Sequence, residues 1–222
     1  MTTPSQTTDP GERVVAAVRH LFDSGVMSHA GHANLSVRLD SERFALTTTG
    51  MVRDLSPEQL ATVNMNGEVL EGALGPENAE IVAMHSVIYK ARDDVGGIIH
   101  THSPSATAFA LANRELPCRA EPLLRFGQAE PVPVVAWGPR GSDVSVRGIA
   151  AALQQHPTTS AVLLANHGLL AFAADPLAAA RLVVAIEEAA EAELAAEAIG
   201  GAVDFPAGAL EAVRESMARV RS

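Results

Sequence analysis

The stretch Val95-Gly96-Gly97-Ile98-Ile99-His100-Thr101-His102 ends in two histidines that follow a short apolar run. An apolar run of this length, bounded by glycines and by Pro104, predicts a buried β-strand. Alternate residues of a strand project from the same face, so His100 and His102 can point toward one metal ion while Thr101 points away. The sequence therefore predicts a strand that carries two candidate metal ligands to the edge of the core.

A third histidine, His167, follows a second apolar run at residues 161–165 and precedes Gly168. If these two strands are neighbours in the sheet, three imidazole rings meet. Three neutral nitrogen ligands with an open fourth position are typical of a catalytic zinc site or of a site for a similar divalent ion. We therefore expect Zn²⁺, or another divalent metal such as Mn²⁺ or Co²⁺. The alternative is that these histidines are structural.

Outside these two strands, helices alternate with strands along the whole chain. Helices are predicted over 10–24, 78–92, 104–112, 148–155, 176–199 and 207–219, and further strands over 35–39, 44–47, 61–65 and 132–136. The last of these strands contains Pro133, which a sheet tolerates only at an edge or a bulge. No linker or change of composition interrupts the alternation, which predicts one α/β domain of two or three layers.

Composition excludes several classes of protein. A formal net charge of -10 argues against a general nucleic-acid binder, because nothing supplies the basic stripe that phosphate neutralisation requires. No apolar run reaches the roughly 20 residues of a membrane span, and residues 1–10 lack the features of a signal peptide. The single Cys118 excludes a zinc site built from paired cysteines. We expect a cytoplasmic protein that acts on a small molecule.

Lysine is almost absent from the chain. Lys90 is the only one, so a Schiff-base mechanism would have to use it. It lies beside Arg92 in a predicted helix without an evident apolar pocket, and we therefore interpret it as a surface residue. The loop Gly138-Pro139-Arg140-Gly141-Ser142 lacks the lysine of a phosphate-binding P-loop and is predicted to be a turn before a helix.

Five short motifs occur in a fixed order along the chain. They are Gly31-His32-Ala33-Asn34-Leu35-Ser36-Val37-Arg38, Thr47-Thr48-Thr49-Gly50, the predicted helix from Glu80 to Val95, the strand from Val95 to Ser103, and Asn166-His167-Gly168-Leu169. In this order and spacing, over about residues 12–200, the chain resembles the class II aldolase/adducin family, which includes metal-dependent aldolases of the fuculose-phosphate aldolase type.

The resemblance implies a three-layer α/β/α fold with a central, largely antiparallel sheet. We expect a single domain of this kind over residues 1–222, in which the polar residues 1–9 form a mobile tail. The resemblance also implies a homotetramer with active sites at subunit interfaces. Motif by motif, it implies these roles: His100, His102 and His167 as metal ligands, Glu80 as the catalytic acid/base, and Asn34, Thr49 and Gly50 as the groups that hold a substrate phosphate.

The implied reaction is cleavage of a carbon–carbon bond next to a carbonyl, on a small sugar or sugar phosphate. A divalent ion stabilises the enediolate that this cleavage leaves, and a carboxylate moves the proton. This route is open to an enzyme without a usable lysine. Glu80 precedes His85 by one residue more than the family's acid precedes its helix histidine, so Glu77 remains a second candidate for the acid/base.

Two further departures keep other reactions open. The family's paired phosphate-binding serines correspond to Asn78 and Ala79, and the position of a family tyrosine is held by Glu121. Arg125 lies close to Glu121 in sequence and could hold a carboxylate in a bidentate pair, so the first alternative is a decarboxylase or aldolase acting on a small keto acid. The second alternative is a non-catalytic, adducin-like binding module, which predicts lost metal ligands.

Overall fold

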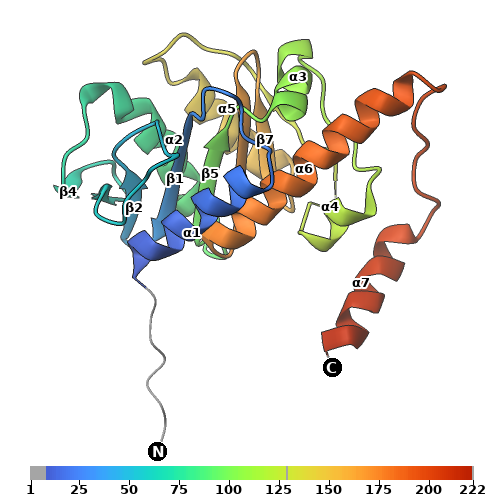
Figure 1. The fold of residues 1–222 in the computed structure, drawn as a ribbon, viewed down its shortest axis with the longest axis horizontal. Helices are drawn as coiled ribbons and strands as arrows, with labels where there is room; N and C mark the ends of the chain where they lie inside the picture. Colours follow the sequence, from blue (N-terminus) through green and yellow to red (C-terminus); the bar gives the residue numbers. More distant parts are fainter. Residues whose placement is uncertain (1–8, 129, 222) are drawn as a thin grey trace, which may run out of the picture.

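A mixed α/β arrangement surrounds one central sheet in the computed structural model, which describes residues 9–128 and 130–221 (Figure 1). Within these residues the sheet has eight strands in the order β4-β3-β2-β1-β5-β8-β7-β6. All neighbouring strands run antiparallel except β6 and β7. The strands are β1 Ala33–Arg38, β2 Arg43–Thr47, β3 Leu60–Asn64, β4 Val69–Glu71, β5 Gly97–Thr101, β6 Val134–Val135, β7 Ala161–Leu164 and β8 Gly168–Ala173.

Helices cover both faces of this sheet, which confirms the three-layer fold. One core joins the sheet to α1, α3 and α6, and a second core joins its other face to α2 and α5. In Figure 1, α1 and α6 cross in front of the strands, and α7 lies at the right-hand end of the molecule. The helices are α1 Pro10–Asp23, α2 Ala79–Ala91, α3 Pro104–Ala112, α4 Glu121–Arg125, α5 Val144–Gln155, α6 Pro176–Glu197 and α7 Ala209–Arg221, with a short 3-10 helix at Pro76–Asn78.

The helix predictions agree with the structure to within a few residues at each end, apart from α4, which was not predicted, and an earlier start for α5. Proline at the first position begins α1, α3 and α6, as expected from its fixed φ and missing N–H. The Asp9 side chain, in contrast, makes no capping hydrogen bond to α1, whereas Asp175 accepts one from the Ala178 N–H at the start of α6. Of the described helices, none is both long and apolar enough to span a membrane. The tail expected at 1–9 lies, except for Asp9, outside the described residues.

The strands at 95–102 and 161–165 are not neighbours, so the condition considered for the meeting of the three histidines does not hold. An additional strand, β8, lies between them and pairs antiparallel with both β5 and β7. Little in the sequence marks β8, because only Asn166, His167 and Gly168 separate the apolar residues of β7 from those of β8. The strand predicted at 132–136 shortens to β6, which lies at the sheet edge as Pro133 requires.

The alternation of side chains along β1 prepares one face of the sheet for chemistry. Leu35 and Val37 enter the core under α1 and α6, so Asn34 and Ser36 face α2 on the opposite side. Asn34 is the register partner of His100 on β5. The pleat therefore places these two polar side chains next to each other, below the N-terminal half of α2.

Candidate metal centre and substrate cleft

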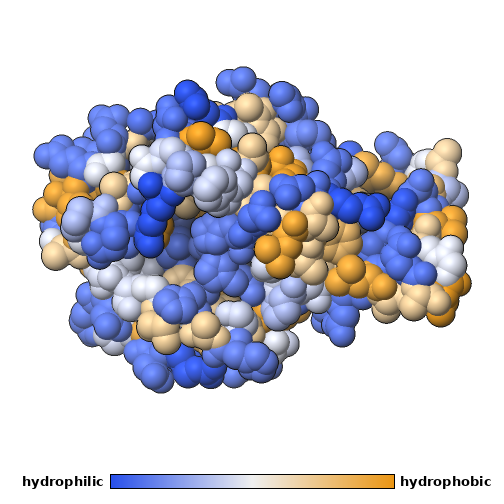
Figure 2. Space-filling model, turned by 90° about the horizontal axis from the view of Figure 1, so that it is seen from above, coloured by the Kyte–Doolittle hydropathy of each residue, from blue (hydrophilic) through white to orange (hydrophobic). Residues whose placement is uncertain are grey.

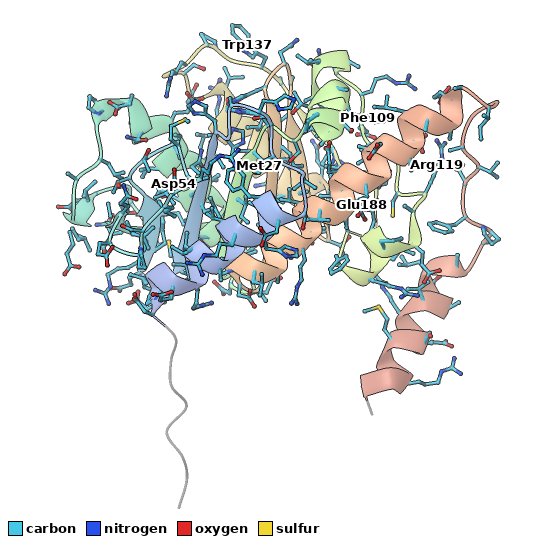
Figure 3. All side chains as sticks on the ribbon, viewed as in Figure 1. Met27, Asp54, Phe109, Arg119, Trp137 and Glu188 are labelled. Atoms are coloured by element: carbon cyan, nitrogen blue, oxygen red, sulfur yellow. The ribbon has the colours of Figure 1, made fainter. Side chains whose placement is uncertain are left out.

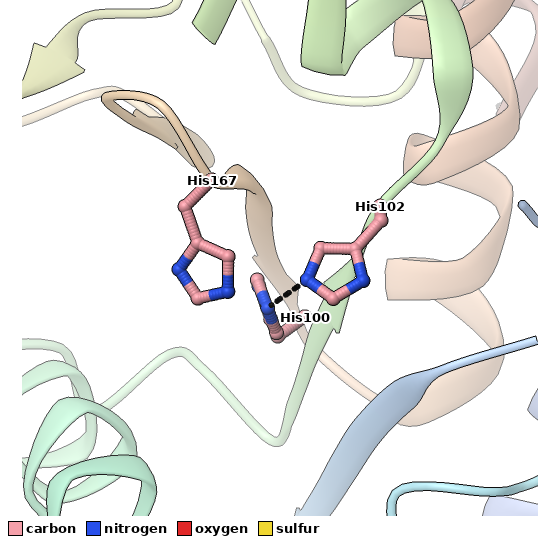
Figure 4. A group of neighbouring side chains, drawn as sticks. All are labelled: His100, His102 and His167. Carbon is pink, nitrogen blue, oxygen red and sulfur yellow. Dashed lines mark hydrogen bonds between the residues drawn. The ribbon is translucent and has the colours of Figure 1, made fainter. Parts of the chain in front are cut away.

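Three histidines meet at one end of the sheet (Figure 4). His100 and His102 lie at and just beyond the end of β5, and His167 lies in the turn between β7 and β8. Each offers one ring nitrogen, and these nitrogens lie within 4.8 Å of one another. Figure 4 shows the three rings facing a common space, with His100 Nε2 and His102 Nε2 3.2 Å apart.

The turn that carries His167 owes its shape to its neighbours. Asn166 adopts a left-handed conformation with φ 56°, which asparagine tolerates better than most residues. The His167 N–H donates to the Leu164 carbonyl and closes the turn. Because β8 pairs with β5, this turn lies beside the end of β5. The predicted meeting of the three histidines is thus confirmed, although it depends on β8 rather than on direct pairing of β5 with β7.

The electrostatics of the cluster suit a divalent metal ion. The His100 Nδ1–H donates to the Leu169 carbonyl at 2.9 Å, which leaves the Nε2 lone pair facing the other rings. Burial lowers the pKa of all three histidines and favours the neutral form that binds metal; for His167 the Glu80 carboxylate opposes this shift and Arg140 adds to it. The Nε2 separation of 3.2 Å is close to that of two nitrogens on a tetrahedral zinc ion, about 3.3 Å for Zn–N bonds of about 2.0–2.1 Å.

Gly168 leaves no room for a side chain beside these histidines. A Cβ at this position would lie 2.5 Å from the Thr101 carbonyl oxygen and 2.9 Å from His102 Cδ2. We expect Gly168→Ala to displace the histidines and to weaken zinc binding by about 10–100-fold, the range found when the support of a metal ligand is lost. Titration with zinc against a competing chelator measures the change.

Gly96→Ala is the matched control for this substitution. A Cβ there would meet the Ala174 carbonyl at the opposite end of the same pair of strands. It is expected to destabilise the fold by about 1–3 kcal/mol without changing the zinc affinity of the folded protein. Equal zinc affinities in the two variants would contradict the role of Gly168.

A cleft of about 770 Å³ opens above the histidines. Figure 2 looks down on this end of the molecule, where the surface is hollowed between mostly hydrophilic side chains. All seven residues predicted for the site line the cleft, together with several others; the predicted ones are Asn34, Thr49, Gly50, Glu80, His100, His102 and His167. The structure therefore brings the whole predicted set together.

A buried chain of hydrogen bonds fixes the orientation of Asn34. The Asn34 Oδ1 lies 2.8 Å from His85 Nε2, the His85 Nδ1 lies 2.7 Å from Ser36 Oγ, and that hydroxyl lies 2.8 Å from the Tyr89 hydroxyl. Since an amide oxygen only accepts, His85 Nε2 carries the proton and Nδ1 accepts from Ser36. The network therefore leaves the amide Nδ2 of Asn34 free to donate into the cleft.

His85 makes stability depend on pH. Burial lowers its pKa from 6.5 to about 3, because the folded protein disfavours the charged ring. Between pH 3 and pH 6.5 the unfolded chain binds a proton at this ring that the folded chain does not. The contribution of the neutral His85 to the free energy of unfolding is therefore complete above pH 6.5 and is lost as pH falls toward 3. This residue alone should lower the free energy of unfolding by up to about 1.4 kcal/mol per pH unit.

Urea unfolding of zinc-free protein at pH 7, 6 and 5 measures this slope. His85→Gln keeps a polar side chain but removes the titration, so its slope should be smaller by that amount. The other three histidines with lowered pKa values are present in both proteins, and their contribution cancels in the comparison. Identical slopes would rule out the assigned cause.

Thr49 and Gly50 complete a corner of hydrogen-bond donors beside Asn34. The Thr49 Oγ1 accepts from the Met51 N–H at 3.1 Å, so its own proton remains available. The Gly50 carbonyl accepts from the Ala33 N–H, which ties the turn to β1. We call Asn34, Thr49 and Gly50 the donor corner; it presents an amide, a hydroxyl and a backbone N–H without a formal charge, a set that suits an anion.

The two candidate acids differ in where their carboxylates lie. Glu80, in the first turn of α2, accepts from the Gly141 N–H at 3.1 Å through Oε2 and lies close enough to raise the pKa of His167 against the effect of burial. Glu77 accepts from the Asn78 side-chain amide through Oε1 at 3.3 Å. Of the two, Glu80 is the carboxylate that faces the histidines.

The structure also shows where Lys90 and Arg125 lie, two residues with predicted roles outside the seven of the site. Lys90 is exposed and bonds to Asn66, and is thus a surface residue as predicted. The neighbouring Tyr89 is buried, and this burial raises the pKa of its hydroxyl. The suggested carboxylate-binding role of Arg125 is not supported within this chain. Arg125 is exposed, pairs with Glu121 on α4 and does not line the cleft.

Among the lining residues that the sequence did not assign to the site, Trp137 and Arg140 are the largest polar or aromatic ones on the β6 side of the cleft. Trp137 and Arg140 follow β6 and line the cleft opposite the donor corner; Figure 3 shows Trp137 at the top of the molecule. Their sequence signal is weak, because a loop rich in glycine and proline without the P-loop lysine predicts only a turn. Only the position of β6 at the edge of the sheet brings it over the histidines.

Comparison with known proteins agrees with this geometry. A 5-deoxy-D-ribulose 1-phosphate aldolase of Bacillus thuringiensis serovar kurstaki is 32% identical over 162 residues, 72% of each chain. A 3-oxo-tetronate 4-phosphate decarboxylase of Haemophilus influenzae is 32% identical over 189 residues, 81% of this chain and 84% of the relative. A solved L-fuculose 1-phosphate aldolase superposes with a TM-score of 0.82 at 27% identity and covers 95% of this chain and 97% of its own.

The family model described as the class II aldolase and adducin N-terminal domain matches residues 12–194. This span contains the eight strands, the three histidines, the donor corner and Glu80. The family generally uses a divalent metal, and the three histidines form a cluster that could hold one. The chain therefore belongs to the class II aldolase and adducin family.

Proposed function

We propose that the protein is a metal-dependent aldolase that cleaves a carbon–carbon bond next to a carbonyl in a small sugar or sugar phosphate. The observation that carries this proposal is the presence, around one cleft, of three neutral histidines, a carboxylate facing them and an uncharged donor corner. Two of the relatives above are named as aldolases of sugar phosphates, which supports the same class of reaction. The substrate proposed here is of that chemical kind.

In this proposal His100, His102 and His167 hold a divalent ion, zinc in the first instance. When bound, the ion supplies a Lewis acid that polarises the carbonyl and stabilises the negative charge that cleavage leaves next to it. The His100 ring is held in the correct tautomer by the Leu169 carbonyl, so no proton has to leave it on binding.

Glu80 is proposed to move the proton at the carbon next to the carbonyl. Its Oε2 is engaged by the Gly141 N–H, which leaves Oε1 for proton transfer. The same hydrogen bond fixes the carboxylate relative to the loop after β6. This arrangement gives the acid/base a defined position, as general acid–base catalysis requires.

The donor corner is proposed to hold the phosphate of a phosphorylated substrate. Asn34 Nδ2 on β1, and the Thr49 hydroxyl and Gly50 N–H in the turn after β2, offer three donors from two neighbouring segments. Their orientation is set beforehand, by His85 for the amide and by Met51 for the hydroxyl. Binding therefore requires little rearrangement.

A second candidate is decarboxylation, or aldol chemistry, on a small keto acid. It is favoured by the similarity to a protein named as a decarboxylase of an oxo acid phosphate and by an arginine in the cleft. The arginine concerned is Arg140 and not Arg125. A non-catalytic, adducin-like binding module is disfavoured, because it predicts lost ligands and all three histidines and Glu80 are present.

We also propose a homotetramer in which neighbouring subunits cover the mouth of the cleft. Met51 and Trp137 are 56% and 61% exposed, and Leu111, also 56% exposed, lies next to Ala110, whose carbonyl accepts from Asn166 of the cleft. Large apolar side chains exposed around a cleft suit burial by a partner. Sedimentation velocity would find monomers if this assembly does not form.

Product analysis by mass spectrometry tests the reaction directly. Zinc-loaded protein is incubated with short ketose 1-phosphates, with their unphosphorylated forms and with β-keto acids. Dihydroxyacetone phosphate plus an aldehyde supports the aldolase, whereas carbon dioxide from a keto acid assigns the protein to the second candidate. Failure to bind zinc or another divalent metal would overturn both candidates.

A further inference from the structure

Arg140 stands out among the residues of the cleft by its charge. Of the described residues that line the cleft, it alone carries a permanent positive charge, while Glu77 and Glu80 carry negative charges. The protein as a whole has a formal net charge of -10, so an anionic substrate meets an unfavourable field over most of the surface. A local cation in the cleft is therefore well placed to select anions.

The guanidinium of Arg140 is largely unused by the protein. It donates one hydrogen bond, from Nη2 to the Glu77 carbonyl at 3.3 Å, and no described carboxylate pairs with it. Other arginines do pair with acids, such as Arg92 with Asp94 and Arg147 with Asp143. Since a guanidinium has five N–H donors, Arg140 keeps a fork of donors free for a ligand.

The order of the strands places Arg140 on the side of the histidines away from the donor corner. Thr49 and Gly50 follow β2 and Asn34 lies in β1, whereas the loop 136–143 follows β6 at the other edge of the sheet. The ends of β5 and β8, which carry the histidines, lie between them. A ligand that contacts the histidines therefore meets uncharged donors on one side and Arg140 on the other.

The loop that carries Arg140 is held in place. The Gly141 N–H donates to Glu80 Oε2, and the Ser142 N–H donates to the Pro139 carbonyl. Gly138 lies against Val144 and Ser142, with no room for a Cβ. Arg140 therefore projects from a braced turn and not from a free loop, which favours a defined binding geometry.

We propose that Arg140 binds an oxyanion of the substrate, a carboxylate or a phosphate, on the side of the histidines opposite the donor corner. This inference rests on the proposed function, because only that function makes the bound anion part of a substrate. It assigns to Arg140 the selection of anionic over neutral hydroxyketones. It replaces the role that the sequence suggested for Arg125.

Trp137 provides the readout, because it is the only tryptophan of the chain and lines the same cleft. Its fluorescence is followed while zinc-loaded protein is titrated with three related probes. These are dihydroxyacetone, which is neutral, hydroxypyruvate, which adds a carboxylate, and dihydroxyacetone phosphate, which adds a phosphate. All three share the hydroxyketone that faces the metal, so differences between them report on the anion.

Arg140→Gln should weaken binding of at least one charged probe by about 10–100-fold, the expected loss of a charge-assisted hydrogen bond. Binding of dihydroxyacetone should change less than about two-fold. Loss confined to hydroxypyruvate identifies the oxyanion as a carboxylate, and loss confined to the phosphate probe identifies it as a phosphate. Arg140→Lys should fall between the two proteins, because an ammonium keeps the charge without the fork.

Arg147→Gln is the matched control, since Arg147 is exposed on α5, carries the same charge and does not line the cleft. The inference is overturned if Arg140→Gln leaves every affinity unchanged, if it weakens dihydroxyacetone equally, if Arg147→Gln has the same effect, or if no charged probe changes the fluorescence of the unmodified protein.

A titration of zinc-free protein with inorganic phosphate and with malonate separates this inference from the proposed function. A response that disappears in Arg140→Gln supports the anion site even if no cleavage or decarboxylation is found, in which case only the proposed function fails. Turnover of a substrate with full activity in Arg140→Gln would leave the proposed function standing and reject the role of Arg140.

Discussion

Replacing His102 by alanine is expected to abolish stable zinc binding and to reduce turnover to background. The proposed site has three protein ligands and loses one third of them, and the two histidines that remain come from β5 and from the β7–β8 turn. The loss should exceed the roughly 10–100-fold that follows removal of a residue merely supporting a ligand. His102 is preferred to His100 for this test because it is only half-buried, whereas His100 is buried against β8.

Zinc content after dialysis, measured by mass spectrometry, is compared with turnover and with the circular dichroism of the same samples. His20→Ala is the control, because His20 lies in the last turn of α1 and outside the cleft. It should keep both zinc and activity. A His102→Ala protein that retains stoichiometric zinc would show that the metal is bound elsewhere, and the centre as described would be wrong.

The histidine pair on β5 was predictable because a strand has a period of two. That period depends only on local geometry, so His100, Thr101 and His102 could be assigned to faces without knowledge of the sheet. A second local pattern, a short apolar run, predicted the strands that became β5 and β7. A local pattern was sufficient to assign residues to a strand and to its faces wherever these residues lie in one strand.

The route by which His167 reaches the other two histidines was not predictable in this way. It requires β8, which follows directly after His167 and pairs with both neighbours. Gly168 and Leu169 were assigned only to a motif, and the apolar residues after them carry no polar alternation that marks a strand, because β8 is buried on both faces. The position of His167 therefore depends on the order in which distant strands pair, and a single sequence does not reveal that order.

The orientation of the Asn34 amide and the position of Arg140 in the cleft also depend on contacts between segments that are distant in the sequence. Asn34 was assigned to the site by motif, but the free amide group follows from a chain of contacts that includes His85 on α2 and Ser36 on β1. Arg140 lies in the cleft because β6 lies at the sheet edge. Arg125 lies outside the cleft because α4 packs against α6 and α7. In each case long-range packing decides which donor is available.

Changing Glu80 to glutamine is expected to lower kcat by about 10²–10⁴-fold, the usual contribution of a general acid–base group. Glutamine has almost the same shape, and its amide oxygen can still accept from the Gly141 N–H, so the loop after β6 keeps its support. Glu80 is not one of the three residues of the histidine cluster, and zinc content should therefore remain close to that of the unmodified protein.

Proton transfer can be measured apart from bond cleavage. Exchange of deuterium from solvent into the carbon next to the carbonyl of dihydroxyacetone phosphate, followed by proton NMR, isolates the step assigned to Glu80. Glu80→Gln should slow this exchange about as much as it slows turnover, because in the proposed function the same carboxylate acts in both. Slow turnover with normal exchange would place the defect in another step.

Glu77→Gln removes the same charge three residues earlier, in the same cleft, and is the matched comparison. Its carboxylate bonds to the Asn78 amide, and Glu80, not Glu77, is the acid that acts on His167, so this variant should keep its exchange rate within a few-fold. If Glu77→Gln slowed the exchange more than Glu80→Gln did, Glu77 would be the acid/base. It would also mean that α2 turns or shifts at its N-terminal end when substrate binds, since Glu80 is the acid that faces the histidines before binding.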